Sequence, residues 1–301
     1  MVSRFSYADA FDRNLGWLTE GEQQALKGKT VAIAGMGGVG GVHLLTLVRL
    51  GVSKFRIADL DCFEVANFNR QVGATMSTLD QPKVDVLAKM AKDINPEAEI
   101  TVFPAGVTPQ NLDAFLEGAD LFIDGFDFFV LDIRRATFAR CRELGIPAMT
   151  AAPVGMGVAF LLFTRDSMSF EDYFRLEGKS ELRQYINFLM GLAPSGMHRS
   201  YLADPARLDI AQRKAPSTMV GVGLCAAYTG AQAVKCLLHR GAVKPAPFHY
   251  HFDAYLNKFK LGFRAGNGGW LQRLKGNAAE RMLRKQLGIG HAELFPSATS
   301  H

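Results

Sequence analysis

A glycine-rich turn with charged side chains downstream of it is the part of this sequence that could do chemistry. The turn, GMGGVG at residues 35–40, follows a short apolar run and precedes a long uncharged stretch. An apolar strand, a glycine turn and the start of a helix form an anion site, because backbone N–H groups can approach a phosphate closely. The glycines expected to bind the phosphates of a nucleotide are Gly35, Gly37, Gly38 and Gly40.

Polar side chains follow the turn in an order that suits a nucleotide. Asp59 lies 19 residues after Gly40. It ends the second predicted strand, where an acid meets the ribose hydroxyls in nucleotide-binding folds. Asp61 comes next and could either bind nucleotide or only begin the turn. Farther along the same loop, the amide of Asn67 and the guanidinium of Arg70 are groups that bind phosphate oxygens.

Lys83 and Asp127 extend this set beyond what a dinucleotide requires. Lys83 opens a predicted helix after Pro82, where a cation opposes the helix dipole, so a nearby anion such as phosphate is expected. Asp124 and Asp127 close the fourth predicted strand, and an acid beside a triphosphate usually binds Mg²⁺. We expect Asp127 to be this ligand and Asp124 to cap the strand end. A dinucleotide site needs only the carboxylate of Asp59, whereas a site that splits ATP needs all of these groups.

Short β-rich runs alternate with helical patterns through the first half of the chain. Strands are expected at residues 30–34, 54–58, 100–103, 121–124 and 148–151, and helices at 38–50, 82–95, 109–117 and 130–144. This alternation predicts an α/β, Rossmann-like fold with a mostly parallel sheet and helices on both faces. Ligands of such sheets bind beyond the carboxyl ends of the strands, where the glycine turn, Asp59 and Asp127 are expected.

After residue 153 the pattern changes. A strand at 158–163 is followed by an insert at 167–216 with one helix at 180–192, then by a buried helix at 219–238 and strands at 248–252 and 258–263. The last two strands predict a C-terminal antiparallel hairpin that extends the sheet. The aromatic density of the insert indicates a lid or a dimer contact. These aromatic residues are Phe170, Tyr173, Phe174, Tyr185 and Phe188.

The chain is expected to form one domain, residues 1–265, with its nucleotide-binding part at 28–152 and a basic tail at 266–301. From Arg264 onward there are six Lys and Arg residues and two Glu residues, so most of the net charge of +5 lies in the tail. The rest of the chain is nearly neutral, which argues against a nucleic-acid groove there. The tail is expected to pack on its own domain, with contact to an anionic membrane surface as the alternative.

Four separated cysteines, none of them in a C-x-x-C pair, indicate neither a zinc site nor a disulfide framework. Because the start of the chain has charged residues and no apolar signal core, a cytoplasmic location is expected. Cys225 is predicted to lie inside the buried helix, where a thiol is usually inert packing.

Together these residues resemble the ThiF/MoeB/HesA family, the adenylating relatives of ubiquitin-activating enzymes. The resemblance runs from about residue 13 to residue 158, with a weaker match at 219–235. Its motifs are specific as an ordered set. They are G-x-G-G-x-G at the turn, then D-x-D, N-x-x-R-Q, Q-P-K and D-x-x-D.

The resemblance implies an ATP-dependent adenylyltransferase that activates a carboxylate as an acyl-adenylate and releases pyrophosphate. ATP would lie on the glycine turn, with Asp59 at the ribose and Mg²⁺ on Asp127. The side chains implied at the phosphates are Asn67, Arg70 and Lys83. The substrate would be a carboxylate, such as the tail of a ubiquitin-like or sulfur-carrier protein.

The family also implies a homodimer in which an N-terminal arginine reaches the phosphates of the other subunit. Arg13 occupies that position here. The glutamine that usually follows this arginine is replaced by Asn14.

Three features depart from the family pattern. Sulfur-carrier activators usually have two C-x-x-C pairs for zinc, which this chain lacks, so no zinc is expected. Many members carry a cysteine in the segment that matches residues 208–216, which contains none here. With Cys225 predicted to be structural, no cysteine thioester step is expected. Phe128 stands where an asparagine commonly follows the second acid.

Two alternatives remain open. Residues 67–71 and 94–97 also resemble the tRNA threonylcarbamoyladenosine dehydratase branch, which adenylates a carboxylate carried on tRNA, although the neutral body does not favour tRNA as a partner. An NAD-dependent oxidoreductase would explain the glycine turn and Asp59. It would leave Arg70, Lys83 and Asp127 without a role.

Overall fold

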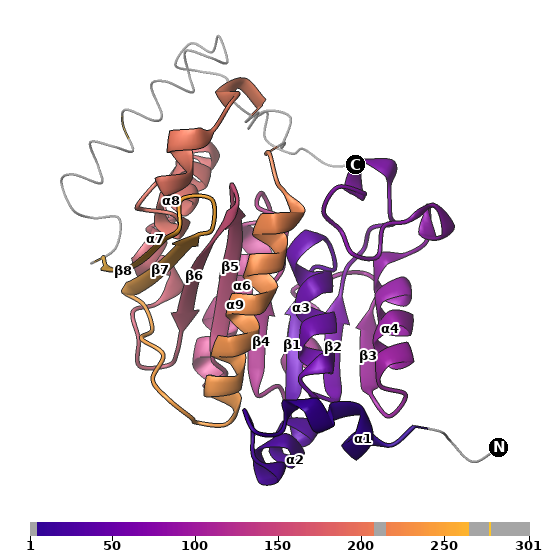
Figure 1. The fold of residues 1–301 in the computed structure, drawn as a ribbon. Coiled ribbons are helices and arrows are strands. Elements are labelled where there is room, and N and C mark those ends of the chain that lie inside the picture. Colours follow the sequence, from indigo (N-terminus) through magenta and orange to yellow (C-terminus); the bar gives the residue numbers. More distant parts are fainter. Residues whose placement is uncertain (1–4, 208–214, 265–276, 278–301) are drawn as a thin grey trace.

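Eight strands form one continuous sheet in the computed structural model, which describes residues 5–207, 215–264 and 277. The strand order is β3-β2-β1-β4-β5-β6-β7-β8 (Figure 1). Strands β1 to β5 run parallel, and β6, β7 and β8 are each antiparallel to the preceding strand. The predicted Rossmann-like sheet with a C-terminal antiparallel hairpin is therefore confirmed. The strands are β1 Thr30–Ala34, β2 Lys54–Ala58, β3 Glu99–Phe103, β4 Leu121–Asp124, β5 Ala148–Val154, β6 Gly157–Phe163, β7 Phe248–Asp253 and β8 Lys258–Phe263.

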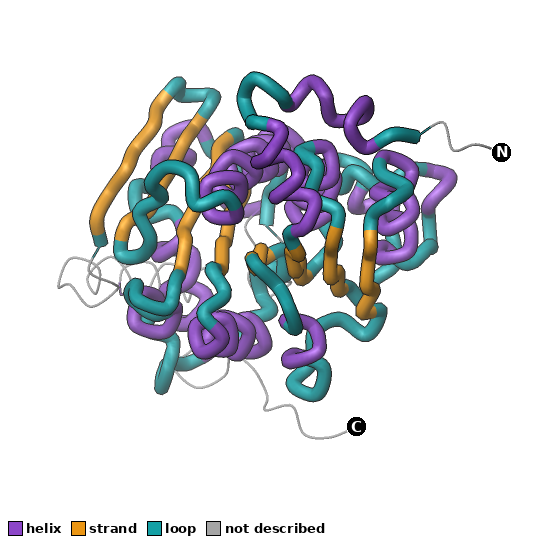
Figure 2. Tube along the Cα trace, turned by 90° about the horizontal axis from the view of Figure 1, so that it is seen from below, coloured by secondary structure: helices purple, strands orange, loops and turns teal. Residues whose placement is uncertain are grey.

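Helices lie on both sides of the strands, as Figure 2 shows. The front face of Figure 1 is covered by α3 (Gly38–Arg49), α4 (Lys83–Ile94) and α9 (Met219–Leu237). The back face is covered by α5 (Leu112–Leu116), α6 (Asp132–Leu144), α7 (Phe170–Phe174) and α8 (Glu181–Leu192). Before β1 come α1 (Tyr7–Phe11) and α2 (Glu20–Gly28). The 3-10 turns are η1 Asp12–Asn14, η2 Val65–Asn67, η3 Met76–Thr78, η4 Met197–Tyr201 and η5 Pro205–Arg207.

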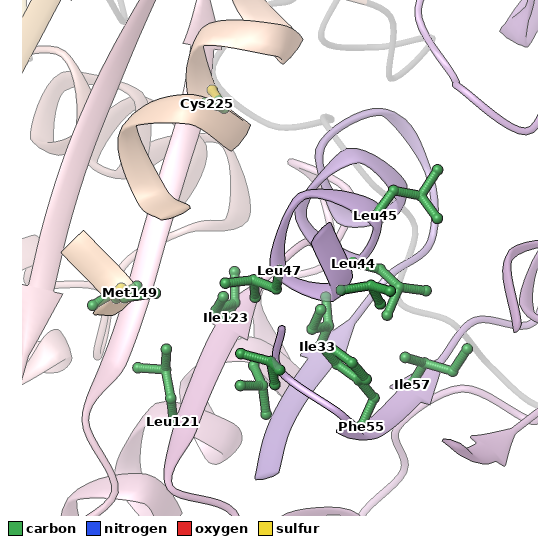
Figure 3. Packing of buried hydrophobic residues seen from close by; sticks show 14 of the residues in the cluster. Ile33, Leu44, Leu45, Leu47, Phe55, Ile57, Leu121, Ile123, Met149 and Cys225 are labelled. Atoms are coloured by element: carbon green, nitrogen blue, oxygen red, sulfur yellow. The ribbon is translucent and has the colours of Figure 1, made fainter. Parts of the chain in front are cut away.

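The central strands are buried on both faces, which explains their continuous apolar sequences. Val31 and Ile33 of β1 belong to the front core, whereas Ala32 and Ala34 belong to the back core. Figure 3 shows front-core side chains of α3 and the central strands gathered around Ile33. Fully burying an aliphatic side chain of this size contributes about 1.5–3 kcal/mol. This packing fixes the carboxyl ends of β1 and β4, which pair directly.

The aromatic residues of the insert form a second core and not a lid or a dimer contact, so that prediction was wrong. Each of the five is at most 5% exposed, and the ring of Phe170 stacks on Phe138 of α6 at 4.4 Å between centroids. They cover the back of the sheet beyond α6, where Phe163 of β6 needs an apolar partner. Aromatic density in the sequence does not reveal which surface it will cover. The short helix α7 was not predicted.

Helix α9 is a core helix. By length and composition it could cross a membrane, but buried helices of soluble proteins pass the same test. It packs against α3, β5 and β6. Cys225 on α9 is fully buried, and this burial raises the pKa of its thiol. The packing agrees with the predictions of a buried helix and a structural cysteine.

The predictions for the basic tail lie outside the described residues, apart from Asn277. Its Oδ1 accepts a hydrogen bond from Arg183 Nη1 at 2.9 Å. Most of the segment at 208–216 is also outside them.

Three histidines are buried in the neutral form. His43 of α3 is 1% exposed, and burial lowers its pKa to about 3. His249 and His251 of β7 are 5% and 0% exposed. Burial is also the largest cause that lowers the pKa of each to about 4. Protonating any of them in the folded state would place a charge in the core.

We therefore expect the free energy of unfolding to fall as the pH falls from about 6.5 to about 4. In this window the unfolded chain binds protons on these histidines and the folded chain does not, so acidification favours the unfolded state. Each histidine contributes a slope of up to about 1.4 kcal/mol per pH unit. Urea unfolding measured across this range checks the slope.

His43→Leu should flatten that pH dependence, because it removes one buried titrating group. His239→Gln, at an exposed position, is the matched control and should leave the slope as in the wild type. Equal slopes in His43→Leu and the wild type would show that His43 does not contribute.

Candidate nucleotide-binding site

The strand order creates a crevice at the carboxyl ends of β1 and β4. β1 lies between β2 and β4, and the helices that follow β1 and β4 cover opposite faces of the sheet. Such a topological switch point is where open α/β sheets bind ligands. The glycine turn follows β1, Asp124 ends β4 and Asp127 follows it, so both predicted segments lie at this crevice.

The four glycines of the turn have two different tasks. Gly35 has φ of +89°, and a Cβ there would overlap the carbonyl group of Gly125. A Cβ on Gly40 would overlap the carbonyl oxygen of Gly35. By contrast, a Cβ on Gly37 or Gly38 would meet its nearest atoms only at ordinary contact distances of 3.4 Å or more. Gly35 and Gly40 are therefore needed to close the turn, while Gly37 and Gly38 keep its outer side open to a ligand.

Asp59 ties the second strand to this turn. Its Oδ2 accepts a hydrogen bond from the backbone N–H of Met36 at 2.5 Å, and its Oδ1 accepts one from Asp61 N at 2.9 Å. A carboxylate oxygen has two lone pairs, so both oxygens can still accept from the hydroxyls of a ribose. Asp59 therefore stabilises the turn, and its contact with a ribose stays a prediction.

Lys83 and Asp61 form an ion pair at the edge of the crevice. Lys83 Nζ lies 2.9 Å from Asp61 Oδ2, and Lys83 N donates to Asp61 O at 3.0 Å. The Lys83 side chain is 7% exposed, whereas that of Asp61 is 58% exposed. The anion expected near Lys83 is thus already present in the chain as Asp61. A phosphate would compete with this carboxylate for the ammonium group.

The loop between β2 and α4 carries the other two predicted phosphate ligands. Asn67 is buried, and its Oδ1 accepts a hydrogen bond from Glu64 N at 3.0 Å. Arg70 Nη1 donates to Ala66 O and Asn69 Oδ1, both at 2.9 Å. Asn67 therefore shapes the loop through its oxygen. Arg70 is held by two local contacts that a phosphate could replace, because both acceptors are neutral.

Asp124 and Asp127 have different environments. Asp124 is 3% exposed and pairs with Arg134 Nε at 3.0 Å. It also accepts a hydrogen bond from Phe126 N at 3.1 Å, the strand-end contact that was expected. Asp127 is exposed, and its Oδ1 accepts a hydrogen bond from Phe129 N at 3.0 Å. Asp127 is thus the acid that a metal ion could reach.

Arg134 was missed by the sequence analysis. Its signal was the Arg134-Arg135 pair in the first turn of α6, where cations oppose the helix dipole just as Lys83 does in α4.

The described residues include no group of three or more His, Cys, Asp or Glu side chains that could hold a metal ion. A Mg²⁺ ion at Asp127 would take its remaining oxygens from nucleotide phosphates and water, which is its usual coordination beside a nucleotide. The exposed carboxylate next to the open glycine turn fits this arrangement.

Arg13 lies far from the crevice of its own chain. It is exposed in η1, and Nδ2 of the next residue, Asn14, donates to Arg49 O at 3.1 Å. Arg49 ends α3, while the glycine turn begins it, and this helix of 12 residues is about 18 Å long. The elements α1 and α2 accordingly lie below the sheet in Figure 1.

A separate cleft of about 500 Å³ lies on the back of the sheet, between α6 and α7. Its arginines are already occupied. Arg135 pairs with Glu171 at 2.7 Å, and Arg142 donates to the carbonyl oxygens of Thr164 and Ser167. None of the predicted site residues lines this cleft, so we place the candidate site at the glycine turn.

Residues 11–265 match the sequence pattern that defines the ThiF family. The chain belongs to the ThiF family. The family resemblance of the motifs is thereby confirmed.

Two curated relatives each match about half of this ThiF-family chain. The chain is 34% identical to the tRNA threonylcarbamoyladenosine dehydratase of Bacillus subtilis over 142 residues, which are 47% of the chain and 55% of that protein. It is 31% identical to the sulfur carrier protein ThiS adenylyltransferase of Escherichia coli over 142 residues, 47% of the chain and 56% of that protein. The chain thus spans about half the length of these relatives.

A solved structure extends the similarity of the fold to most of the ThiF-family chain. The E. coli protein MccB, crystallised with MccA-N7isoASN, superposes with a TM-score of 0.66 at 18% identity. The match covers 86% of this chain and 72% of MccB. At this identity the comparison establishes the fold.

Gly40→Ala should destabilise the turn and abolish ATP binding, because the added Cβ would overlap the backbone oxygen of Gly35, which cannot rotate away. Gly223→Ala in α9 is the matched control, since nothing lies within 4 Å of its added Cβ. Alanine there should stabilise the helix by about 1 kcal/mol. Thermal unfolding and calorimetry with ATP measure both effects. Wild-type Tm and ATP affinity in Gly40→Ala would contradict this geometry.

Proposed function

We propose that this protein is an ATP-dependent adenylyltransferase that activates a carboxylate as an acyl-adenylate and releases pyrophosphate. The observation that carries the proposal is the set of groups around the crevice between β1 and β4. An open glycine turn follows β1, the exchangeable Lys83–Asp61 pair lies after β2, and the exposed Asp127 follows β4, and these three strands are neighbours in the sheet. Membership of the ThiF family supports the same activity.

The proposed roles follow from the contacts of each residue. The backbone of Gly37 and Gly38 would receive the phosphates, and Asp59 the ribose, through the lone pairs that remain on its oxygens. Lys83 and Arg70 would exchange their present partners for phosphate oxygens. Asn67 would shape the loop that carries Arg70, and Asp61 would keep Lys83 in place between turnovers.

In the proposed reaction a carboxylate oxygen attacks the α-phosphorus of ATP. A new oxygen–phosphorus bond forms, the bond from the α-phosphorus to the bridging oxygen breaks, and pyrophosphate leaves with the electron pair. Mg²⁺, held by Asp127 and the phosphates, would offset the charge on the departing oxygens. The protein contributes mainly orientation of the two reactants and the positive charges of Lys83 and Arg70.

We propose that no cysteine thioester follows. Cys225 is fully buried, and its raised thiol pKa disfavours the thiolate that such a step requires. Of the described cysteines, Cys62 is exposed, so Cys62→Ser belongs among the controls. The acyl group would pass from AMP directly to its acceptor.

The relatives suggest three classes of carboxylate. One relative is named for a sulfur carrier protein, one for a modified tRNA, and MccB was crystallised with MccA. We favour a protein or peptide tail, because the body of this chain has little net charge with which to bind RNA. The identity to the B. subtilis dehydratase makes a dehydratase-like reaction on tRNA the second candidate.

ATP·Mg should bind to this protein and NAD should not, because Arg70, Lys83 and Asp127 serve a triphosphate and have no task with a dinucleotide. Calorimetry with the two ligands tests this difference. ATP–pyrophosphate exchange with a panel of carrier-protein tails, peptides and threonylcarbamoylated tRNA then identifies the substrate class. Binding of NAD without a response to ATP would overturn the proposal.

We also propose that the protein works as a homodimer in which Arg13 serves the site of the neighbouring subunit. Within its own chain Arg13 lies at the far end of α3 from the glycine turn. Trp17, four residues after Arg13, is 84% exposed, and Arg240 Nη1 donates to its carbonyl oxygen at 2.8 Å. A rigidly presented tryptophan is typical of a protein–protein contact.

Arg13→Ala should bind ATP but lose most pyrophosphate exchange, since the loss of one charge-stabilising contact raises the barrier by about 3–4 kcal/mol. Mixing it with Lys83→Ala should restore part of the activity, because some heterodimers then contain one intact composite site. Native mass spectrometry must confirm that subunits exchange. Activity that stays absent after confirmed exchange would show that Arg13 does not act in trans.

A further inference from the structure

The loop that carries Asp127 has no regular secondary structure of its own. It joins β4 to α6 and spans residues 125–131. Its short-range hydrogen bonds run from Phe129 N to Asp127 Oδ1 and from Val130 N to Asp127 O, at 3.0 and 3.1 Å. These bonds close a local turn but do not attach it to the body of the protein.

Gly125 N donates to Ala34 O at 2.8 Å and so attaches the start of the loop to β1, whereas the guanidinium of Arg134 attaches the part that carries Asp127. Arg134 is 2% exposed, and its Nε donates to the buried carboxylate of Asp124. Its Nη1 and Nη2 donate to main-chain carbonyl oxygens of the loop at 2.8–3.3 Å. The loop thus wraps its carbonyl groups around one buried cation, which leaves the Asp127 side chain on the outside. The carbonyl oxygens belong to Phe126, Asp127, Phe128 and Val130.

Helix α8 of the insert supports this arrangement from behind. The Phe188 ring lies 4.7 Å from the guanidinium carbon of Arg134. Phe188 also contacts the ring of Phe128 at 5.3 Å between centroids. Tyr185 Oη lies 3.2 Å from the Phe129 carbonyl oxygen and 2.6 Å from Glu181 Oε1, and its single hydrogen is shared between these two acceptors. The loop is therefore fixed both by α6 and by a helix that lies more than 50 residues later in the chain.

We infer that Arg134, supported by α8, is the positioning residue that sets the Asp127 carboxylate for the metal ion of the nucleotide complex. The inference rests on the proposed ATP·Mg function. Mg²⁺ demands near-ideal octahedral geometry, so a ligand on an irregular loop needs its backbone fixed. A guanidinium suits this task because its rigid, forked donors bind several carbonyl oxygens at once, which an ammonium group with three donors on a flexible stem cannot do.

The variant Arg134→Lys keeps the positive charge opposite Asp124 but removes the forked guanidinium donors that bind the loop carbonyl oxygens. Its test is calorimetry with an ATP analogue that has a methylene group between the α- and β-phosphates, in Mg²⁺ and then in EDTA. We expect the affinity in Mg²⁺ to fall about 10–100-fold, as for other residues that orient metal ligands. Affinity in EDTA should stay near that of the wild type. Asp127→Asn should remove the same Mg²⁺-dependent gain.

The matched control is Arg135→Lys. Arg135 is the next residue of α6, and its guanidinium pairs with Glu171. This variant should keep the wild-type response to Mg²⁺. Hydrogen exchange of the backbone amides at 126–130 gives a second readout, and it should be faster in Arg134→Lys than in Arg135→Lys.

Tyr185→Phe keeps the inference testable if Arg134→Lys does not fold, because it removes one hydroxyl from α8 and leaves the aromatic packing in place. It should weaken Mg²⁺-dependent affinity in the same direction, but by less. A Mg²⁺ response equal to the wild type in whichever of these variants folds would overturn the inference. If the wild type itself binds the analogue equally in Mg²⁺ and EDTA, the proposed function fails instead.

Discussion

The contact between two backbone turns, one after β1 and one after β4, is the constraint on which the rest of the site depends. Gly35 and Gly125 approach each other so closely that no side chain fits between them, and Gly40, in the first turn of α3, lies against the Gly35 carbonyl group. This approach is possible because β1 and β4 are neighbours in the sheet. It brings the phosphate-binding turn and the Asp127 loop to one crevice.

The two ion pairs near the crevice differ in whether a ligand could replace one of the partners. Lys83 is paired with a carboxylate whose side chain is 58% exposed, so a phosphate could replace Asp61 without leaving a charge buried and unpaired. The side chains of Arg134 and Asp124 are only 3% and 2% exposed. Breaking this pair would leave a buried charge without a partner. The first pair therefore suits a ligand-binding role, and the second suits a permanent structural one.

The sequence predicted the elements with strong periodicity and left out those that depend on distant contacts. The bounds of β1, β2, β4 and β8 were predicted to the residue, because each apolar run ends at a turn signal. Helix α7 was missed because it has only five residues, and its aromatic side chains pack on α6 and β6, which are distant in the sequence. The roles of Arg134 and Phe188 depend on a loop that wraps around a side chain, and no local pattern encodes such wrapping. The ion pair between Lys83 and Asp61 was not predicted either, although an anion near Lys83 was expected.

The place of α9 in the chain has a consequence for how the protein is made. The parallel strands come from residues 30–154, but α9, which covers β5 and β6 on the front face, comes from Met219–Leu237. At about 5–20 residues per second, the ribosome needs on the order of ten seconds to proceed from the end of β5 to the end of α9. Until α9 is made, the front side chains of Met149 and, once it is synthesised, Phe160 lack the contacts that α9 supplies. The nascent chain therefore presents an apolar surface until α9 emerges.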